Sequence, residues 1–326
     1  MRTVTSLILL LLCIVGGNAQ PPLSDLAHTY SIVAVDSVTG EIGAAVQSHW
    51  FSVGSLVIWA EAGVGAVATQ SFVNPMFGPE GLRLMREGKS APEALKTLVE
   101  KDEGRDFRQV AMIDHTGRSA AFTGLKCIAE AGHRFGPYYS VQANMMLNAT
   151  VWSAMEEAFL NSRAPLAERL LAALEAAEKE GGDIRGRQSA AILVVRPKST
   201  GKVWQDVLVD LRVEDHPEPV KELSRLLKVH RAYEHMNAGD LAVENGDEQK
   251  ALKEYGMAMK LQPDNLEMKY WTAVSLVNMG NVNDALPLFQ SVFQADNNWR
   301  LLTPRLVPNG LLKTKPGDLE KIVNLP

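Results

Sequence analysis

The chain has 326 residues, of which 46% are hydrophobic and 22% are charged, and its formal net charge is −5. This length allows two domains with buried cores, and the composition is typical of a soluble globular protein. The small negative charge and the lack of a basic block argue against nucleic acid as a partner and against binding to an anionic membrane surface.

The first residues have the pattern of a secretion signal. Arg2 precedes an apolar stretch at 6–16, and small residues at 17–19 suit cleavage before Gln20. The apolar stretch is short for a membrane-spanning helix, and two prolines follow it. We therefore predict a signal peptide over 1–19, a secreted or periplasmic protein without a membrane span after cleavage, and a linker or pro-segment over 20–28.

Cysteine and histidine usage predicts no metal site, and no cofactor is expected. Removal of the signal leaves one cysteine, Cys127, so a disulfide framework is excluded. Its thiol is a possible nucleophile, but a small buried hydrophobic role is the more common one for such a residue. The histidines are scattered, without the spacing of a metal-binding motif.

Short strands and helices follow one another over residues 29–220. We predict strands at 29–36, 40–48, 56–61, 63–70, 108–114, 119–123, 188–195 and 203–209. We predict helices at 80–87, at 91–101 with Ser90 as N-cap, and over 151–179 with an interruption near Pro165. This order predicts a layered α+β sandwich, in which helices pack on stacked antiparallel sheets.

After the segment 215–219 the pattern becomes purely helical and an internal repeat appears. The matched positions, 34 residues apart, are Gly246 and Gly280, Ala251 and Ala285, Tyr255 and Phe289, and Ala258 and Val292. This period predicts tetratricopeptide-like repeats within an all-α domain over 225–300, near 232–265 and 266–299. Residues 301–326 form a C-terminal tail. Repeats of this kind are expected to bind a protein partner.

Several phrases of the sequence resemble one bacterial family. They are YSIVA at 30–34, AEAGVGAVATQ at 60–70, SVQANMM at 140–146, DIRGRQSAA at 183–191 and RVEDHP at 212–217. With these, residues 29–230 resemble the domain of unknown function 1028 family. The family is grouped with the N-terminal-nucleophile hydrolase-like fold, which implies a four-layer αββα sandwich and leaves the substrate open.

The resemblance extends to the C-terminal end, and the chain differs from the family pattern at two places. The segments 298–306 and 310–312 resemble the family's peptidoglycan-binding-like tail, which implies peptidoglycan as a second possible partner. This chain has Ala143 where relatives commonly have glycine. It also has Gln20 to His28 ahead of the threonine that ordinary methionine removal exposes in cytosolic relatives.

Thr29 is the candidate nucleophile because it starts the first predicted strand. In an N-terminal-nucleophile hydrolase the free α-amine of the chain is the base for its own side-chain hydroxyl. Ser31 shares the same strand face and is a second candidate, as an assistant or as the reacting hydroxyl. Thr29 also suits a plain strand start, since β-branched residues favour strands.

Four amide side chains are candidates for substrate binding or for stabilising an oxyanion. Gln70 and Asn74 flank the turn after the fourth predicted strand, where amide groups can donate hydrogen bonds. Gln142 and Asn144 alternate on a strand and can point into one cleft. The alternatives are a simple turn for the first pair and a capped sheet edge for the second.

A charged pair and a histidine complete the candidate set. Asp183 and Arg185 can bind a substrate carboxylate or hold the nucleophile's amine, or can form a salt bridge in a loop. Ser48 and His49 end the hairpin and can face Thr29 across the sheet, although this chemistry does not require a histidine.

Three functions remain open on this reading. The first is an exported amidohydrolase that cleaves a small amide or peptide-like substrate, with cell-wall fragments among the candidates and Thr29 as nucleophile. The second is a non-catalytic binding protein in which Thr29 stays internal. The third is a scaffold at the cell envelope whose helical repeats carry the function.

Overall fold

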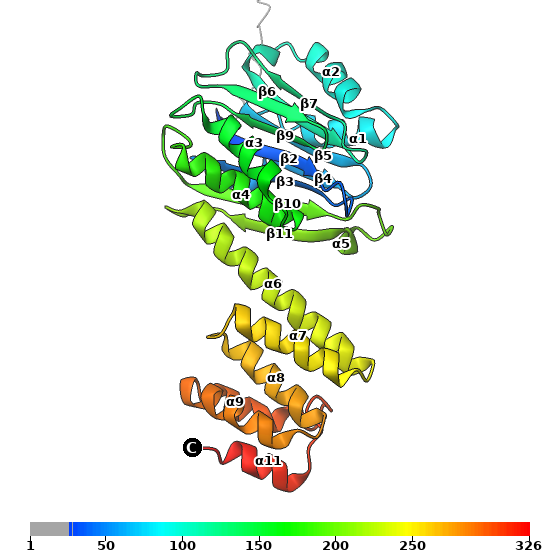
Figure 1. Cartoon of the computed structure of the whole chain (residues 1–326), viewed down its shortest axis with the longest axis vertical. Coiled ribbons are helices and arrows are strands. Elements are labelled where there is room, and N and C mark those ends of the chain that lie inside the picture. The colour runs from blue at the N-terminus through cyan, green and yellow to red at the C-terminus, as the bar shows by residue number, and fades with distance from the viewer. Residues whose placement is uncertain (1–25, 28) are drawn as a thin grey trace, which may run out of the picture.

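The computed structural model describes residues 26–27 and 29–326 (Figure 1). The predicted signal peptide and most of the predicted linker lie outside the described residues. Figure 1 shows a layered αβ body at one end of the molecule and a purely helical region at the other, joined by the long helix α6 (Pro219–Glu244).

Six strands form the sheet that contains β2, called here the β2 sheet. In spatial order they are β11 (Val207–Val213), β10 (Ser189–Val195), β3 (Ile42–Ser48), β2 (Thr29–Val35), β9 (Tyr139–Ala143) and β8 (Gly132–Gly136). Every neighbouring pair in this sheet is antiparallel. Strand β2 therefore lies inside the sheet and is paired along both edges.

Five strands form the other sheet, called here the β5 sheet. They are β1 (Leu26–Ala27), β5 (Gly65–Phe72), β6 (Arg108–Asp114) and β7 (Ser119–Thr123) in this order, with β4 (Ile58–Glu61) also paired to β5. Two residues of the predicted linker thus form a strand. They pair with Ser71 and Phe72 at the end of β5.

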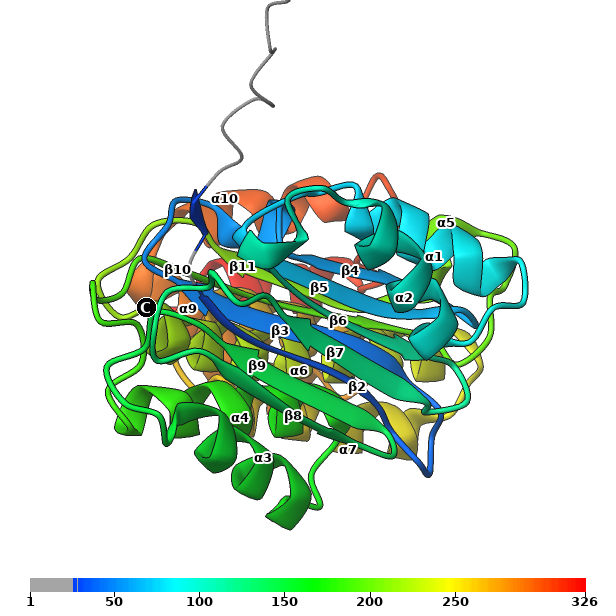
Figure 2. The same cartoon turned by 90° about the horizontal axis from the view of Figure 1, so that it is seen from above.

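Helices cover the outer face of each sheet (Figure 2). Helices α1 (Phe77–Arg86) and α2 (Ala91–Lys101) pack on the β5 sheet, and α3 (Val151–Asn161) and α4 (Leu166–Lys179) pack on the β2 sheet. The capping box between Ser90 and Glu93 fixes the start of α2. Three apolar layers result, one between the sheets and one under each helix pair.

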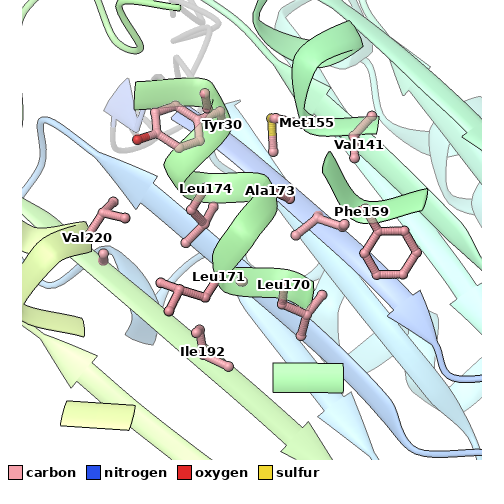
Figure 3. Close-up of a cluster of buried hydrophobic side chains, with 14 of the residues drawn as sticks. Tyr30, Val141, Met155, Phe159, Leu170, Leu171, Ala173, Leu174, Ile192 and Val220 are labelled. Atoms are coloured by element: carbon pink, nitrogen blue, oxygen red, sulfur yellow. The ribbon is translucent and has the colours of Figure 1, made fainter. Parts of the chain in front are cut away.

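The core under α3 and α4 contains the largest buried side chains of the β2 sheet (Figure 3). Tyr30 and Ile192 project from the sheet toward Leu170 and Leu174 of α4. The Tyr30 hydroxyl donates a hydrogen bond to Glu178, so its polar end is satisfied inside the core. Burial and the neighbouring Glu178 carboxylate raise the pKa of Tyr30 well above its usual value.

Helices follow one another through the C-terminal part. They are α6, α7 (Glu248–Leu261), α8 (Leu266–Asn278), α9 (Val282–Ala295), α10 (Asn298–Leu302), a 3-10 turn (Thr303–Leu306) and α11 (Pro316–Val323). Tail residues Leu306, Leu312 and Ile322 are buried in the same core as Tyr270 and Phe289. The tail is thus packed on α8 and α9. No described helix has the length and apolar character needed to cross a bilayer.

The structure confirms a mixed α+β protein with antiparallel sheets and a C-terminal helical region. One predicted strand differs, because 203–209 begins with a short helix, α5 (Val203–Asp206), and the strand runs over 207–213. The Asp206 carboxylate accepts hydrogen bonds from Ser199 and Thr200, which closes a loop before the strand. Such side-chain bonds compete with strand pairing.

Other bounds also differ from the sequence prediction: β3 and β4 begin two residues later than predicted, and β5 runs over 65–72 instead of 63–70. Strand β8 was not predicted, because this edge strand is bounded by glycines and has no clear apolar alternation. Helix α1 begins at Phe77, three residues before the predicted start.

Candidate functional site

Polar side chains replace apolar ones at one end of the layer between the two sheets. Val33 and Val35 of β2 are buried in the inter-sheet core. Because side chains alternate along a strand, Thr29 and Ser31 point to the same face. The same change occurs on the facing strands. Ala68 of β5 and Ala111 of β6 lie in the apolar core, and Gln70 and Gln109 take the next positions on the same faces. The inter-sheet layer is therefore apolar along most of its length and polar at the Thr29 end.

We call this end the inter-sheet polar cluster. Its members are Thr29, Ser31, Gln70, Gln109, Gln142 and Asn144, and each has no exposed surface. They come from β2, β5, β6, β9 and the residue after β9. Buried polar groups cost free energy unless they are hydrogen-bonded, so such a cluster is stable only as a network.

Ser31 lies at the centre of a chain of side-chain hydrogen bonds. Its hydroxyl donates to Oε1 of Gln70 over 2.6 Å and accepts from Nε2 of Gln142 over 2.6 Å. The hydroxyl of Ser140 then donates to Oε1 of Gln142 over 3.0 Å. Ser31 thus links the two sheets, and Gln142 lies inside the structure rather than at a sheet edge.

Gln109 is a member that the sequence prediction missed. Its Oε1 accepts from Gln70 Nε2 over 2.7 Å and from Asn144 Nδ2 over 2.9 Å. Its Nε2 donates to the Ala143 carbonyl and to the Thr123 hydroxyl, both over 2.9 Å. The available signal was the alternation of positions 109, 111 and 113, which places a glutamine on the buried face of a strand.

The main chain of Thr29 is held by two of these amide residues. Its carbonyl oxygen accepts from Gln70 Nε2 over 3.0 Å and from the Asn144 backbone N–H over 3.1 Å. The side chain of Thr29 is fully buried. The backbone of Ala27, two residues earlier, pairs with Ser71 of the other sheet. In the uncut chain, Thr29 is therefore an internal residue at the start of β2.

Two residues with left-handed backbone flank the cluster. Ser71, which follows Gln70, has φ of 73°, and Met145, which follows Asn144, has φ of 58°. Residues other than glycine adopt this conformation at a cost in free energy. Such outliers concentrate at functional sites, where the surrounding structure keeps them in place.

A row of hydroxyl side chains continues from Thr29 across the β2 sheet. Thr29 lies opposite Ser48, and Ser48 lies opposite Ser189. All three are buried. Ser48 thus faces Thr29 as predicted. His49 follows at the exposed end of β3, where its ring contacts the Arg187 carbonyl over 3.4 Å.

The predicted Asp183–Arg185 pair forms in the loop between α4 and β10. The buried Asp183 carboxylate accepts from Arg185 Nε over 3.1 Å and Nη2 over 2.7 Å, and from the His49 backbone N–H over 3.2 Å. Asp183 and Arg185 border a cavity of about 430 Å³. Its lining is Leu147, Gly181, Asp183, Ile184, Arg185, Gly186, Arg187 and Pro217. The His49 contact places this cavity near the Thr29 end of the sheet.

Two residues considered from the sequence lie outside the cluster. Asn74 is half-buried in the loop before α1, where its side chain accepts a hydrogen bond from the Met76 backbone N–H over 3.2 Å. Cys127 donates a hydrogen bond to the Arg108 carbonyl over 3.3 Å, and burial raises the pKa of its thiol. A raised pKa disfavours the nucleophilic thiolate.

Comparison with known protein families matches residues 29–223 to a family of unknown function, DUF1028. The chain belongs to the DUF1028 family. The match begins at Thr29 and ends within the first turns of α6. The DUF1028 region therefore contains the inter-sheet polar cluster, and most of the helical region lies beyond it.

A solved structure agrees with this assignment. The crystal structure of a DUF1028 protein from Silicibacter pomeroyi is 34% identical, covers 62% of this chain and 88% of its own, and superposes with a TM-score of 0.56. A search of curated proteins gives no match.

Proposed function

We propose that this protein is an amidohydrolase of the N-terminal-nucleophile type, with Thr29 as nucleophile after the chain is cut between His28 and Thr29. The observation that carries the proposal is the position of Thr29. It is the first residue of β2, it faces the other sheet, and it lies among buried amide side chains. A reacting hydroxyl needs such fixed polar surroundings.

The chemistry follows from a free α-amine at Thr29. The amine takes the hydroxyl proton as the oxygen attacks the substrate's carbonyl carbon. The C–N bond then breaks, the amine leaves with that proton, and water releases the acyl group from Thr29. Gln70 and Asn144 are the candidate amide donors near the developing oxyanion, because both already donate to Thr29.

The cavity beside Asp183 is the candidate position for the rest of the substrate. Arg185 and Arg187 line it, and arginine binds carboxylates through paired hydrogen bonds. An amide or peptide-like substrate with a free carboxylate fits this lining, and cell-wall fragments belong to this class. The predicted signal peptide favours a secreted or periplasmic location for such a substrate.

We also assign α6 to α9 to two tetratricopeptide-like repeats and the tail to a peptidoglycan-binding-like segment. The positions matched at the 34-residue spacing have like environments. Ala251, Ala285, Tyr255, Phe289, Ala258 and Val292 are all buried, and both Gly246 and Gly280 have positive φ. The repeats would bring the sandwich to a protein partner or to peptidoglycan.

A non-catalytic binding protein is the second candidate. The observation that favours it is the pairing of Leu26–Ala27 with β5, which makes these two residues part of the β5 sheet. In that case the uncut chain is the final form and the cavity beside Asp183 binds a ligand without cleaving it.

The N-terminus of the purified protein distinguishes the two candidates. Intact mass and N-terminal sequencing are expected to give a chain that starts at Thr29, and a β-lactone probe is expected to acylate it. The Thr29→Ala variant should lose the acylation, whereas Thr97→Ala, on the surface of α2, should keep it. A native chain that stably retains residues before Thr29 and resists the probe would favour the binding protein.

A further inference from the structure

The helical region contains a groove of about 500 Å³ between α6, α7 and α8. Figure 1 shows these three helices side by side, away from the inter-sheet polar cluster. The groove is lined by Tyr233, Met236, Asn237, Asp240, Val243, Glu244, Tyr255, Glu267, Met268, Trp271, Val274, Ser275, Asn278 and Leu311. A volume of this size accommodates a small ligand or a few residues of a peptide.

The charges that line the groove are all negative. Asp240 and Glu244 lie on α6 and Glu267 lies on α8, and the lining has no lysine, arginine or histidine. None of the ion pairs between the described side chains includes these three carboxylates. Other carboxylates of the same helices are neutralised, such as Glu222 by Arg225.

Two of these carboxylates destabilise helix α6 by mutual repulsion. Asp240 and Glu244 are four residues apart on α6, and like charges at this spacing destabilise a helix. The Tyr255 hydroxyl donates to Asp240 over 2.7 Å, and the Tyr233 hydroxyl donates to Glu267. These bonds orient the carboxylates but leave their negative charge in place.

Aromatic and apolar side chains form the rest of the groove. Trp271 and Tyr233 are partly exposed, and their ring faces attract a cation electrostatically, whereas Tyr255 is buried. Val243 adds half-buried apolar surface, and Met236 and Met268 are buried residues of the lining. The amide of the exposed Asn237 offers both a donor and an acceptor, as a peptide backbone requires.

We propose that this groove binds an extended segment of a partner protein through a lysine or arginine side chain. The ammonium or guanidinium group would lie between Asp240, Glu244 and Glu267, with its aliphatic stem over Trp271. The negative lining and the ring faces match such a side chain and repel an acidic one. This proposal does not depend on the proposed enzymatic activity.

The test uses the full chain and an immobilised library of hexapeptides. Lysine or arginine is expected to be enriched at one position, and the best peptide is then titrated beside a copy with norleucine in place of that basic residue. The norleucine copy should bind about fivefold to tenfold more weakly, and the difference should shrink in high salt. Enrichment of acidic residues, no enrichment, or equal binding of the two copies would overturn the proposal.

Matched charge removals locate the site. Glu244→Gln and Asp240→Asn are each expected to weaken the lysine peptide more than the norleucine copy. Glu248→Gln removes the same charge from α7 outside the groove, and its binding should stay at the native level. If the groove variants keep native affinity, or if Glu248→Gln weakens binding equally, the groove is not the binding site.

Discussion

Gln109, like Ser31, joins the two sheets through side-chain hydrogen bonds. It bonds to Gln70 in the neighbouring strand and to Asn144 and the Ala143 carbonyl at the end of β9. A buried donor or acceptor that loses its partner costs about 1–3 kcal/mol. The loss of one side chain here leaves several groups without partners at once.

We expect Gln109→Leu to lower the free energy of unfolding by about 2–5 kcal/mol, since it removes these buried bonds without removing much volume. Urea denaturation measures the change. Gln205→Leu, at an exposed position in α5, is the control and should change the stability little. Equal stability of the two variants would show that the network adds nothing to the fold.

Helix α6 belongs to both parts of the molecule. Its first turns bury Val220, Leu223 and Leu227 against the β2 sheet. One turn later, Arg231 forms an ion pair with Glu168 of α4 over 2.7 Å. Arg231 also pairs with Glu234 within the helix over 2.7 Å.

Acid should weaken this part of α6. Burial favours a higher pKa for Glu234, but the neighbouring His230 and the hydrogen bond and charge of Arg231 outweigh it and lower the pKa from 4.5 to about 2. A folded pKa below the unfolded one stabilises the protein above pH 4.5, and this contribution is lost as pH falls through about 2. In urea melts between pH 5.5 and 2, Glu234→Gln should lose less stability than the native chain. Identical losses would contradict this assignment.

At the scale of the molecule, we expect the sandwich to need the start of α6 but not the rest of the helical region. A chain that ends after residue 217 lacks Val220, Leu223 and Leu227, each of which contributes about 1.5–3 kcal/mol when buried. A chain that ends after Arg231 keeps them. We expect the longer chain to unfold at a clearly higher urea concentration, as measured by circular dichroism. Equal midpoints would mean that α6 is not part of the sandwich core.

The sequence alone predicted most elements because their causes are local. Ser90 and Glu93 cap α2, and a continuous apolar run at 110–113 marks β6, so both elements lie at their predicted bounds. Thr29 and Ser31 were selected as candidates from strand position and family resemblance. Ser48 and His49 were candidates to face Thr29 because they end the hairpin, and Ser48 lies opposite Thr29.

The tertiary structure decided which residues share a site. Gln109 contacts Asn144 although 35 positions separate them, and Asn74 lies apart although it is close to Gln70 in sequence. Which of these side chains meet depends on how the two sheets stack. A local sequence pattern does not show which strands, distant in the sequence, will face each other. The sequence therefore determined the helices and strands and the family match that begins at Thr29. Packing between the two sheets determined the buried polar network around Thr29.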